Sequence, residues 1–123
     1  MAKTKAVLYK EKNAKTAPLL EWLDDIPEKA RLKCIEKIRR LEEEGHQLRR
    51  PEADLLRDKI HELRASLQGI HYRILYFFHG NIAAVLSHGI VKEDRVPPIE
   101  IDRAIQNKKN FEKDPQSHTY EEK

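Results

Sequence analysis

The stretch HELRASLQGIHYRILYFFHG, residues 61–80, decides the fold of this chain. Apolar and polar side chains alternate through it, as is typical of β-strands, and Gln68-Gly69 at its centre favours a turn. We therefore predict two antiparallel strands. Arg64 and Arg73 lie inside them, where apolar and β-branched residues are preferred. The two arginines are expected to converge on one face, opposite to the face that carries Leu63 and Ala65.

Apolar periodicity on either side of this hairpin predicts the other elements. Upstream, Leu32, Ile35, Ile38 and Leu41 recur at three-residue intervals and mark one face of a helix. Downstream, Gly80-Asn81 favours a second tight turn. The predicted elements are a strand at 6–10, helices at 18–26 and 28–44, a connecting segment at 45–56, strands at 60–67, 70–79 and 82–91, and a last helix opened by Pro98.

This order predicts an α+β domain. It consists of an N-terminal strand, two helices, a three-stranded antiparallel meander and a C-terminal helix. We expect the helices to pack on one face of the sheet and the polar sides of the strands to point towards the other. Residues 1–112 are predicted to form this single domain, and residues 113–123 a polar, loosely held C-terminal tail.

Composition limits the class of protein but does not identify a function. The 123 residues correspond to one domain, and the net charge of +3, from 24 basic and 21 acidic residues, is a weak argument for nucleic-acid binding. Cys34 is the only cysteine, so no intramolecular disulfide forms, and it is expected to be an inert core thiol. Neither a signal peptide nor an apolar run of the roughly 18 residues of a membrane helix is seen. We expect a cytoplasmic protein.

Three segments carry a family resemblance: LRDKIHELR (56–64), YRILYFF (72–78) and VLSHGIVKEDRVPPIEIDRA (85–104). In this order and at these spacings they resemble the HigB/RelE-type toxins of bacterial type II toxin–antitoxin systems, in particular the phage-derived, HigB-like branch of the RelE/ParE superfamily. The resemblance runs from about Leu55 to Phe111 and implies a RelE-like fold.

The resemblance also implies an activity and partners. Such toxins are mRNA interferases, metal-independent endoribonucleases that enter the ribosomal A site and cut translated mRNA without a cofactor. A helix-turn-helix antitoxin, HigA-like in this branch, neutralises the toxin, and the pair contacts operator DNA through the antitoxin.

Metal-free RNA cleavage sets three chemical tasks. The 2′-hydroxyl must lose a proton, charge on the phosphoryl oxygens must be stabilised, and the leaving 5′-oxygen must gain a proton. Arginine suits the second task because its planar fork binds phosphate oxygens in pairs. The arginines of the family's ELR and YR motifs fall on Arg64 and Arg73, which are therefore candidate catalytic residues. The alternative is a structural ion pair with Glu62, two residues from Arg64.

The resemblance makes Lys92, at the end of HGIVK, and His88, at the HG position, further catalytic candidates. The alternatives are a solvated lysine and a buried, hydrogen-bonded histidine. The family pattern often has a second lysine after Lys92, but this chain has Glu93 and Asp94 there, which weakens the basic patch.

The remaining cations are assigned to RNA binding. Arg95 is expected to compensate for the acidic pair that follows Lys92. Arg57 and Lys59, ahead of the first meander strand, are expected either to contact the ribosomal RNA backbone or to be solvated charges. No metal site is expected, because the histidines lack the spacing of zinc ligands.

Two other functions stay open from the sequence. One is a gyrase-poisoning toxin of the ParE type, which has the same fold but acts by binding. The other is a non-catalytic binding domain, favoured by the acidic pair and by the lack of an obvious general base. One fold hosts several functions, so the fold does not choose among them.

Overall fold

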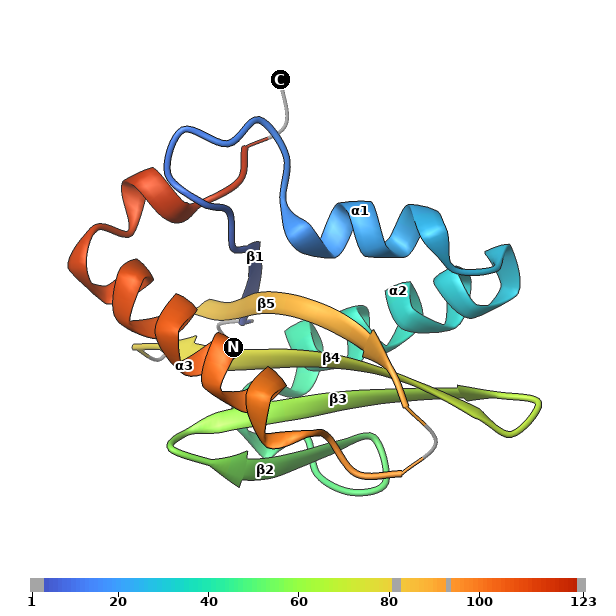
Figure 1. The fold of residues 1–123 in the computed structure, drawn as a ribbon. Helices are drawn as coiled ribbons and strands as arrows, with labels where there is room; N and C mark the ends of the chain where they lie inside the picture. Colours follow the sequence, from blue (N-terminus) through green and yellow to red (C-terminus); the bar gives the residue numbers. More distant parts are fainter. Residues whose placement is uncertain (1–3, 81–82, 93, 122–123) are drawn as a thin grey trace.

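A computed structural model describes residues 4–80, 83–92 and 94–121 of the chain (Figure 1). Asn81 of the predicted turn and Glu93 of the acidic pair lie outside the described residues. The elements are β1 (Lys5–Leu8), α1 (Pro18–Asp25), α2 (Glu28–Glu44), the short 3-10 helix η1 (Gly45–Gln47), β2 (Ala53–Arg57), β3 (Ile60–Leu67), β4 (Ile70–His79), β5 (Ala83–Val91), α3 (Pro98–Lys113) and the 3-10 helix η2 (Gln116–His118).

The strands form one mixed sheet in the order β1-β5-β4-β3-β2. Strands β2 to β5 are a continuous antiparallel meander, while β1 pairs in parallel with β5. The α+β class is therefore confirmed, but the meander has four strands rather than three. The predicted connecting segment at 45–56 contains most of β2, a five-residue edge strand whose Ala53 pairs with Leu63.

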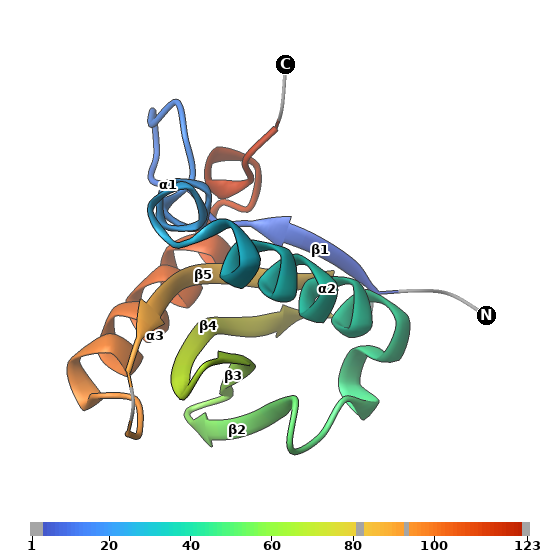
Figure 2. The ribbon, with the colours of Figure 1, turned by 90° about the vertical axis from the view of Figure 1, so that its right-hand side faces the viewer.

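Helices cover both faces of the sheet, so the expectation that all of them share one face is wrong for α3 (Figure 2). Helices α1 and α2 pack on the face that carries Leu63, Ile74 and Tyr76. Helix α3 packs on the opposite face, against Leu75 and Phe77. Strand β4 therefore carries apolar residues on both sides, which is the pattern of a strand covered on both faces.

Gly89 in β5 is required by the close approach of α1. A Cβ atom at this position would lie 2.2 Å from Cδ2 of Trp22, so no other residue fits without moving the indole. The glycine of the HG pair thus has a packing role in this chain.

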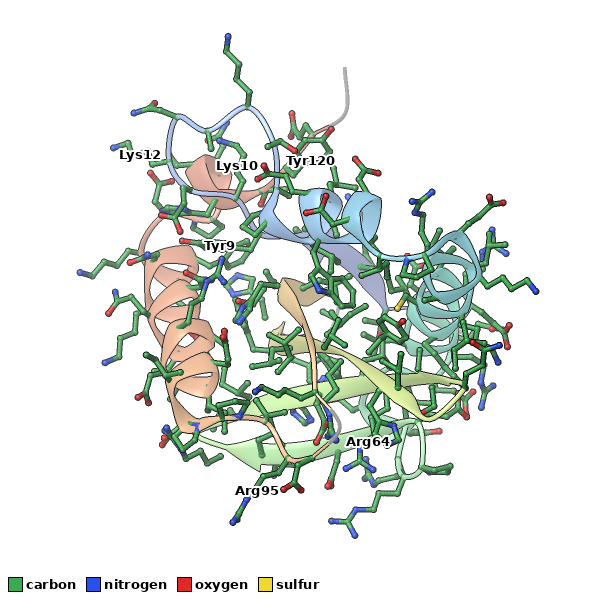
Figure 3. All side chains as sticks on the ribbon, turned by 45° about the vertical axis from the view of Figure 1, so that its right-hand side comes forward. Tyr9, Lys10, Lys12, Arg64, Arg95 and Tyr120 are labelled. Carbon is green, nitrogen blue, oxygen red and sulfur yellow. The ribbon has the colours of Figure 1, made fainter. Side chains whose placement is uncertain are left out.

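The C-terminal tail is held as far as Tyr120, in contrast to the loose tail that was expected. Lys10 N donates to the carbonyl of His118 at 3.0 Å, and Tyr120 N donates to the carbonyl of Leu8 at 2.9 Å. The His118 ring stacks on Tyr9 with centroids 5.2 Å apart. Figure 3 shows Tyr9 and Tyr120 on the same side of the molecule. The tail extends the domain at the end of β1.

The Cys34 thiol is buried in the core under α2, and burial raises its pKa to about 12. The expected core position is confirmed. Within the described part of the chain, no helix is long and apolar enough to cross a bilayer.

A buried polar chain holds α3 against β5. Asn107 Nδ2 donates to Ser87 Oγ at 2.8 Å, and Ser87 Oγ lies 2.8 Å from Nδ1 of His88. His88 Nε2 lies 3.0 Å from Oε1 of Glu100 at the start of α3. The chain is complete when Ser87 donates to Nδ1 and the neutral imidazole donates from Nε2 to the carboxylate.

Acid should weaken this connection. Burial lowers the pKa of His88 to about 4, helped by the charge of Arg103 and opposed by Glu100. An unfolded histidine titrates near 6.5, so between these values the unfolded chain binds more protons than the folded chain. The free energy of unfolding should therefore fall as the pH drops from about 6.5 to about 4, by roughly 2–3 kcal/mol.

Urea unfolding at a series of pH values tests this prediction. His88→Gln keeps an amide donor but does not titrate, so its stability should fall less steeply than that of the wild type over the same range. His79→Gln, outside the polar chain, is the matched control and should retain the wild-type slope. Equal slopes for His88→Gln and the wild type would contradict the assignment.

Candidate functional site

A cleft of about 690 Å³ opens on the α3 face of the sheet, where α3 does not cover the strands. Strands β2, β3 and β4 supply its floor, with further side chains from α2 and from the connection between β5 and α3. Its charged lining consists of five cations and four carboxylates: Lys33, Lys37, Arg64, Arg73, Arg95, Glu52, Asp54, Glu62 and Asp94. Figure 3 shows Arg64 and Arg95 on the same side of the molecule.

Arg64 and Arg73 lie directly opposite each other on β3 and β4. Like charges at such positions repel, and Glu62, which precedes Arg64 by two residues on the same face, offsets that repulsion. Glu62 Oε1 lies 2.6 Å from Arg73 Nη1, and Glu62 Oε2 accepts from Arg64 Nη2 at 3.2 Å. One carboxylate that is 2% exposed therefore orients both guanidinium groups.

The two arginines differ in how accessible they are. The Arg64 side chain is 30% exposed and its Nη2 also reaches Asp54 Oδ2 at 3.4 Å. The Arg73 side chain is 9% exposed, and its Nη2 donates to the carbonyl of Asp94 in the β5–α3 connection. A ligand in the cleft can contact Arg64 directly, whereas Arg73 lies beneath that connection.

The Nε atoms of both arginines are buried. Arg64 Nε lies 3.2 Å from Glu62 Oε1 and so shares that carboxylate, whereas Arg73 Nε makes no hydrogen bond to any described residue. Buried polar atoms in native proteins normally have partners. A ligand therefore meets the exposed part of Arg64, whose side chain is 30% exposed, before any donor of Arg73.

A second layer of ion pairs surrounds the cleft on the β2 side. Glu52 bonds Arg40 Nη2 at 3.2 Å and Lys37 Nζ at 3.3 Å, and these bonds, led by that of Arg40, lower the pKa of Glu52. Asp54 lies 2.9 Å from Arg50 Nη2, the main cause of its lowered pKa. Both carboxylates are ionised at neutral pH and limit the positive potential of the cleft.

His71 was not predicted as a site residue, but it lines the cleft beside Arg73. Its Nδ1 lies 2.7 Å from Oγ of Ser66, the residue opposite it on β3. The sequence contained the signal, because alternation along β4 places His71 on the same face as Arg73. The cleft thus combines arginines, an imidazole and a hydroxyl.

Of the other predicted residues, only Arg95 lines the cleft, and it is exposed. Lys92 is exposed just beyond β5, where its backbone N–H donates to the carbonyl of His71 at 3.1 Å, but its side chain does not line the cleft. His88 is 1% exposed and belongs to the polar chain under α3.

Arg57 and Lys59 lie at the tight turn between β2 and β3, next to the start of α3. Arg57 Nη2 lies 2.5 Å from Asp102 Oδ1, and Arg57 Nη1 lies 3.0 Å from Asp58 Oδ2. Lys59 is exposed and has a φ of 66°, as a tight turn requires. Neither residue lines the cleft. Within the described residues, no three metal-ligating side chains are grouped.

Removing the charge of Glu62 should destabilise the protein. Glu62→Gln leaves the guanidinium of Arg73 buried without an anion, which typically costs about 3–5 kcal/mol. Asp102→Asn breaks the exposed ion pair with Arg57 and serves as control, with an expected loss of about 1 kcal/mol or less. Urea unfolding of both variants measures the difference. Equal, small losses would show that Glu62 does not hold the arginine pair.

The chain from residue 21 to residue 109 matches the family of phage-derived Gp49-like proteins (DUF891). The match begins in α1, ends in α3 and includes every strand that lines the cleft. No curated protein matches the chain significantly. The matched family spans well over half of the chain and is a toxin-like family of toxin–antitoxin systems. The chain therefore belongs to the phage-derived Gp49-like family of toxin-like proteins.

Proposed function

We propose that this protein is the HigB-like toxin of a type II toxin–antitoxin system and acts as a metal-independent, ribosome-dependent endoribonuclease on translated mRNA. The observation that carries the proposal is the pair of arginines placed directly opposite each other at the floor of a cleft. Membership of a toxin-like family supports the same reading.

In the proposed reaction, the 2′-oxygen of one nucleotide attacks the adjacent phosphorus. The bond from phosphorus to the 5′-oxygen breaks, leaving a 2′,3′-cyclic phosphate and a 5′-hydroxyl end. Charge grows on the non-bridging oxygens during the attack. Arg64 binds these oxygens from the open side of the cleft, and Arg73 binds them once the substrate replaces the carbonyl of Asp94 as its partner.

His71 is proposed as the acceptor of the 2′-hydroxyl proton, since it is the imidazole that lines the cleft. When Nδ1–H donates to Ser66 Oγ, the lone pair is on Nε2, and this atom takes the proton. The leaving 5′-oxygen takes its proton from solvent water, and His71 later returns its proton to solvent. Arg95 in the cleft lining and Lys92, exposed just beyond β5, are proposed to supply positive charge during this step.

The partners follow from this assignment. Arg57 and Lys59, on the exposed β2–β3 turn, are proposed to contact the ribosomal RNA backbone. A HigA-like helix-turn-helix antitoxin is the proposed neutralising partner, and operator DNA is contacted only through it.

One observation favours a second candidate, a non-catalytic binding domain of the same fold. Arg64 and Arg73 are both already paired with Glu62, and four carboxylates line the cleft beside five cations. A gyrase-binding toxin of the ParE type would likewise need no cleavage chemistry. The experiment below separates all three functions.

The test maps new 5′-hydroxyl ends on cellular mRNAs after induction in bacteria. We expect the wild type to produce cuts within translated codons. Arg64→Ala should reduce their frequency about a hundredfold, because one donor to the developing charge is lost. Arg64 is the better target because Arg73→Ala would remove the shorter of the two ion pairs of the buried carboxylate of Glu62 and so destabilise the fold. Arg73→Lys keeps the charge but loses the planar fork, and should also impair cutting.

Arg39→Ala, an exposed position on α2, is the matched control and should cut as the wild type does. Soluble accumulation of every variant is checked first. Growth arrest without cuts would exclude the nuclease, and a gyrase cleavage assay would then test the ParE alternative. The absence of both growth arrest and cuts would support the non-catalytic binding domain. Cuts that persist in Arg64→Ala and Arg73→Lys would remove the arginine pair from the chemistry.

A further inference from the structure

A second cleft, of about 610 Å³, lies on the α2 face of the sheet at its outer edge, and we name it the edge cleft. Strand β2 and the segment between α2 and β2 form its walls. Six of its lining side chains matter here: His46, Arg49, Arg50, Asp54, Leu55 and His61. Of the first three, only Arg50 takes part in the ion pairs around the other cleft, through Asp54.

The edge cleft contains stacked rings at its surface. His46 is exposed and its ring lies on Phe78, with centroids 3.7 Å apart and planes 20° from parallel. Because His46 is exposed and lines the edge cleft, its ring is accessible to a ligand there. His61 stacks on Tyr76 at 5.1 Å, and Leu55 is 58% exposed beside it. A planar base has a flat, partly apolar surface to bind here.

Two exposed arginines border these rings. Arg49 Nη1 donates to the carbonyl of His46 at 2.5 Å, and Arg50 Nη2 lies 2.9 Å from Asp54 Oδ2. Each guanidinium has five N–H donors. The other donors of both groups make no hydrogen bond to the residues that the structure describes. Fixed at one end and open at the other, they are suited to phosphate oxygens.

Asp54 joins the edge cleft to the cleft of about 690 Å³ lined by Arg64 and Arg73, which we name the arginine cleft. It lines both, and its Oδ2 is bonded by Arg64 from one side and by Arg50 from the other. Cationic groups therefore continue from Arg64 around the end of β2 to Arg50 and Arg49. A chain of phosphates that leaves the arginine cleft across this edge passes Asp54 and reaches Arg50 and Arg49 on its other side.

We propose that the edge cleft binds the single-stranded RNA that flanks the cleaved bond, with a base stacked on His46 and phosphates held by Arg49 and Arg50. The inference rests on the proposed function in taking RNA as the ligand. Aromatic platforms beside a cationic groove are the usual means of binding single strands without sequence readout. An acidic protein segment would use the arginines but would gain nothing from an open ring face.

Fluorescence anisotropy at low ionic strength tests the proposal on the full chain. The probe is a labelled, uncleavable 2′-O-methyl RNA of roughly ten nucleotides. His46→Leu still covers Phe78 but offers no flat ring, and should weaken binding about tenfold. His46→Trp restores a platform and should bind at least as tightly as the wild type. Arg49→Ala should weaken binding and reduce the slope of log affinity against log salt by roughly 0.7.

His79→Leu and Arg39→Ala are the matched controls. His79 is a histidine against the ring of Phe111, away from both clefts, and Arg39 is an exposed arginine of α2. Both should bind RNA as the wild type does, and thermal unfolding should show all variants folded. Weakening by the controls equal to that of His46→Leu would overturn the proposal, as would a wild type that does not bind the probe.

A polyglutamate peptide is the competing ligand. If it binds through His46 and Arg49 while RNA does not, the edge cleft holds an acidic protein segment and the proposal fails. Failure of the proposed function looks different. If RNA binding depends on His46 but the protein never cuts mRNA, the edge-cleft proposal stands and the nuclease proposal fails. If cutting needs Arg64 but His46→Leu binds RNA as the wild type does, the nuclease proposal stands and the edge-cleft proposal fails.

Discussion

The buried carboxylate of Glu62 is the constraint on which both the sheet and its cleft depend. The register of β3 and β4 places Arg64 and Arg73 side by side, an arrangement that would destabilise the strand pairing if no anion stood between the charges. Glu62 bonds both and, through its position two residues from Arg64, does so on the same face. The interaction that permits this register also fixes the direction of the two guanidinium groups.

The position of α3 determines how deep the arginines lie. Apolar residues on both sides of β4 require cover on both faces, and α3 supplies it for Leu75 and Phe77 only. The polar half of the face, from Glu62 to His71, stays open as the cleft. Because Asn107 and Glu100 tie α3 to Ser87 and His88, the chain between β5 and α3 crosses above Arg73 and caps it. The histidine suggested as a catalyst thus shapes the site without entering it.

Periodic patterns in the sequence predicted the features that depend on neighbouring residues, such as which face of a strand carries a given side chain. Alternation alone is enough to place Arg64 on the face opposite to Leu63. The apolar stripe expected in α2 is right for Ile38 and Leu41 but wrong for Leu32, which is 58% exposed, because the buried face of the helix runs through Ala30 and Cys34. Strand β2 was missed because it is short, lies at an edge and follows a charged, proline-containing segment. The face chosen by α3 and the pairing of the tail with β1 depend on contacts between residues far apart in the chain, such as Tyr120 and Leu8, which leave no periodic signal. The same alternation also places His71 on the face of Arg73, whereas the family resemblance pointed to His88 instead.

The near balance of positive and negative charges in the arginine cleft orients its arginines but adds little long-range attraction for RNA. The arginine cleft has five cations and four carboxylates, and the whole chain has a net charge of only +3, so a long-range field does little to attract RNA. Binding energy must then come from short-range geometry, namely paired N–H donors and stacked rings. The carboxylates that weaken the field are the same groups that aim the arginines, because Glu62 and Asp54 hold Arg64 between them. Under the proposed function, the ribosome would deliver the substrate, which fits a site whose own field is weak.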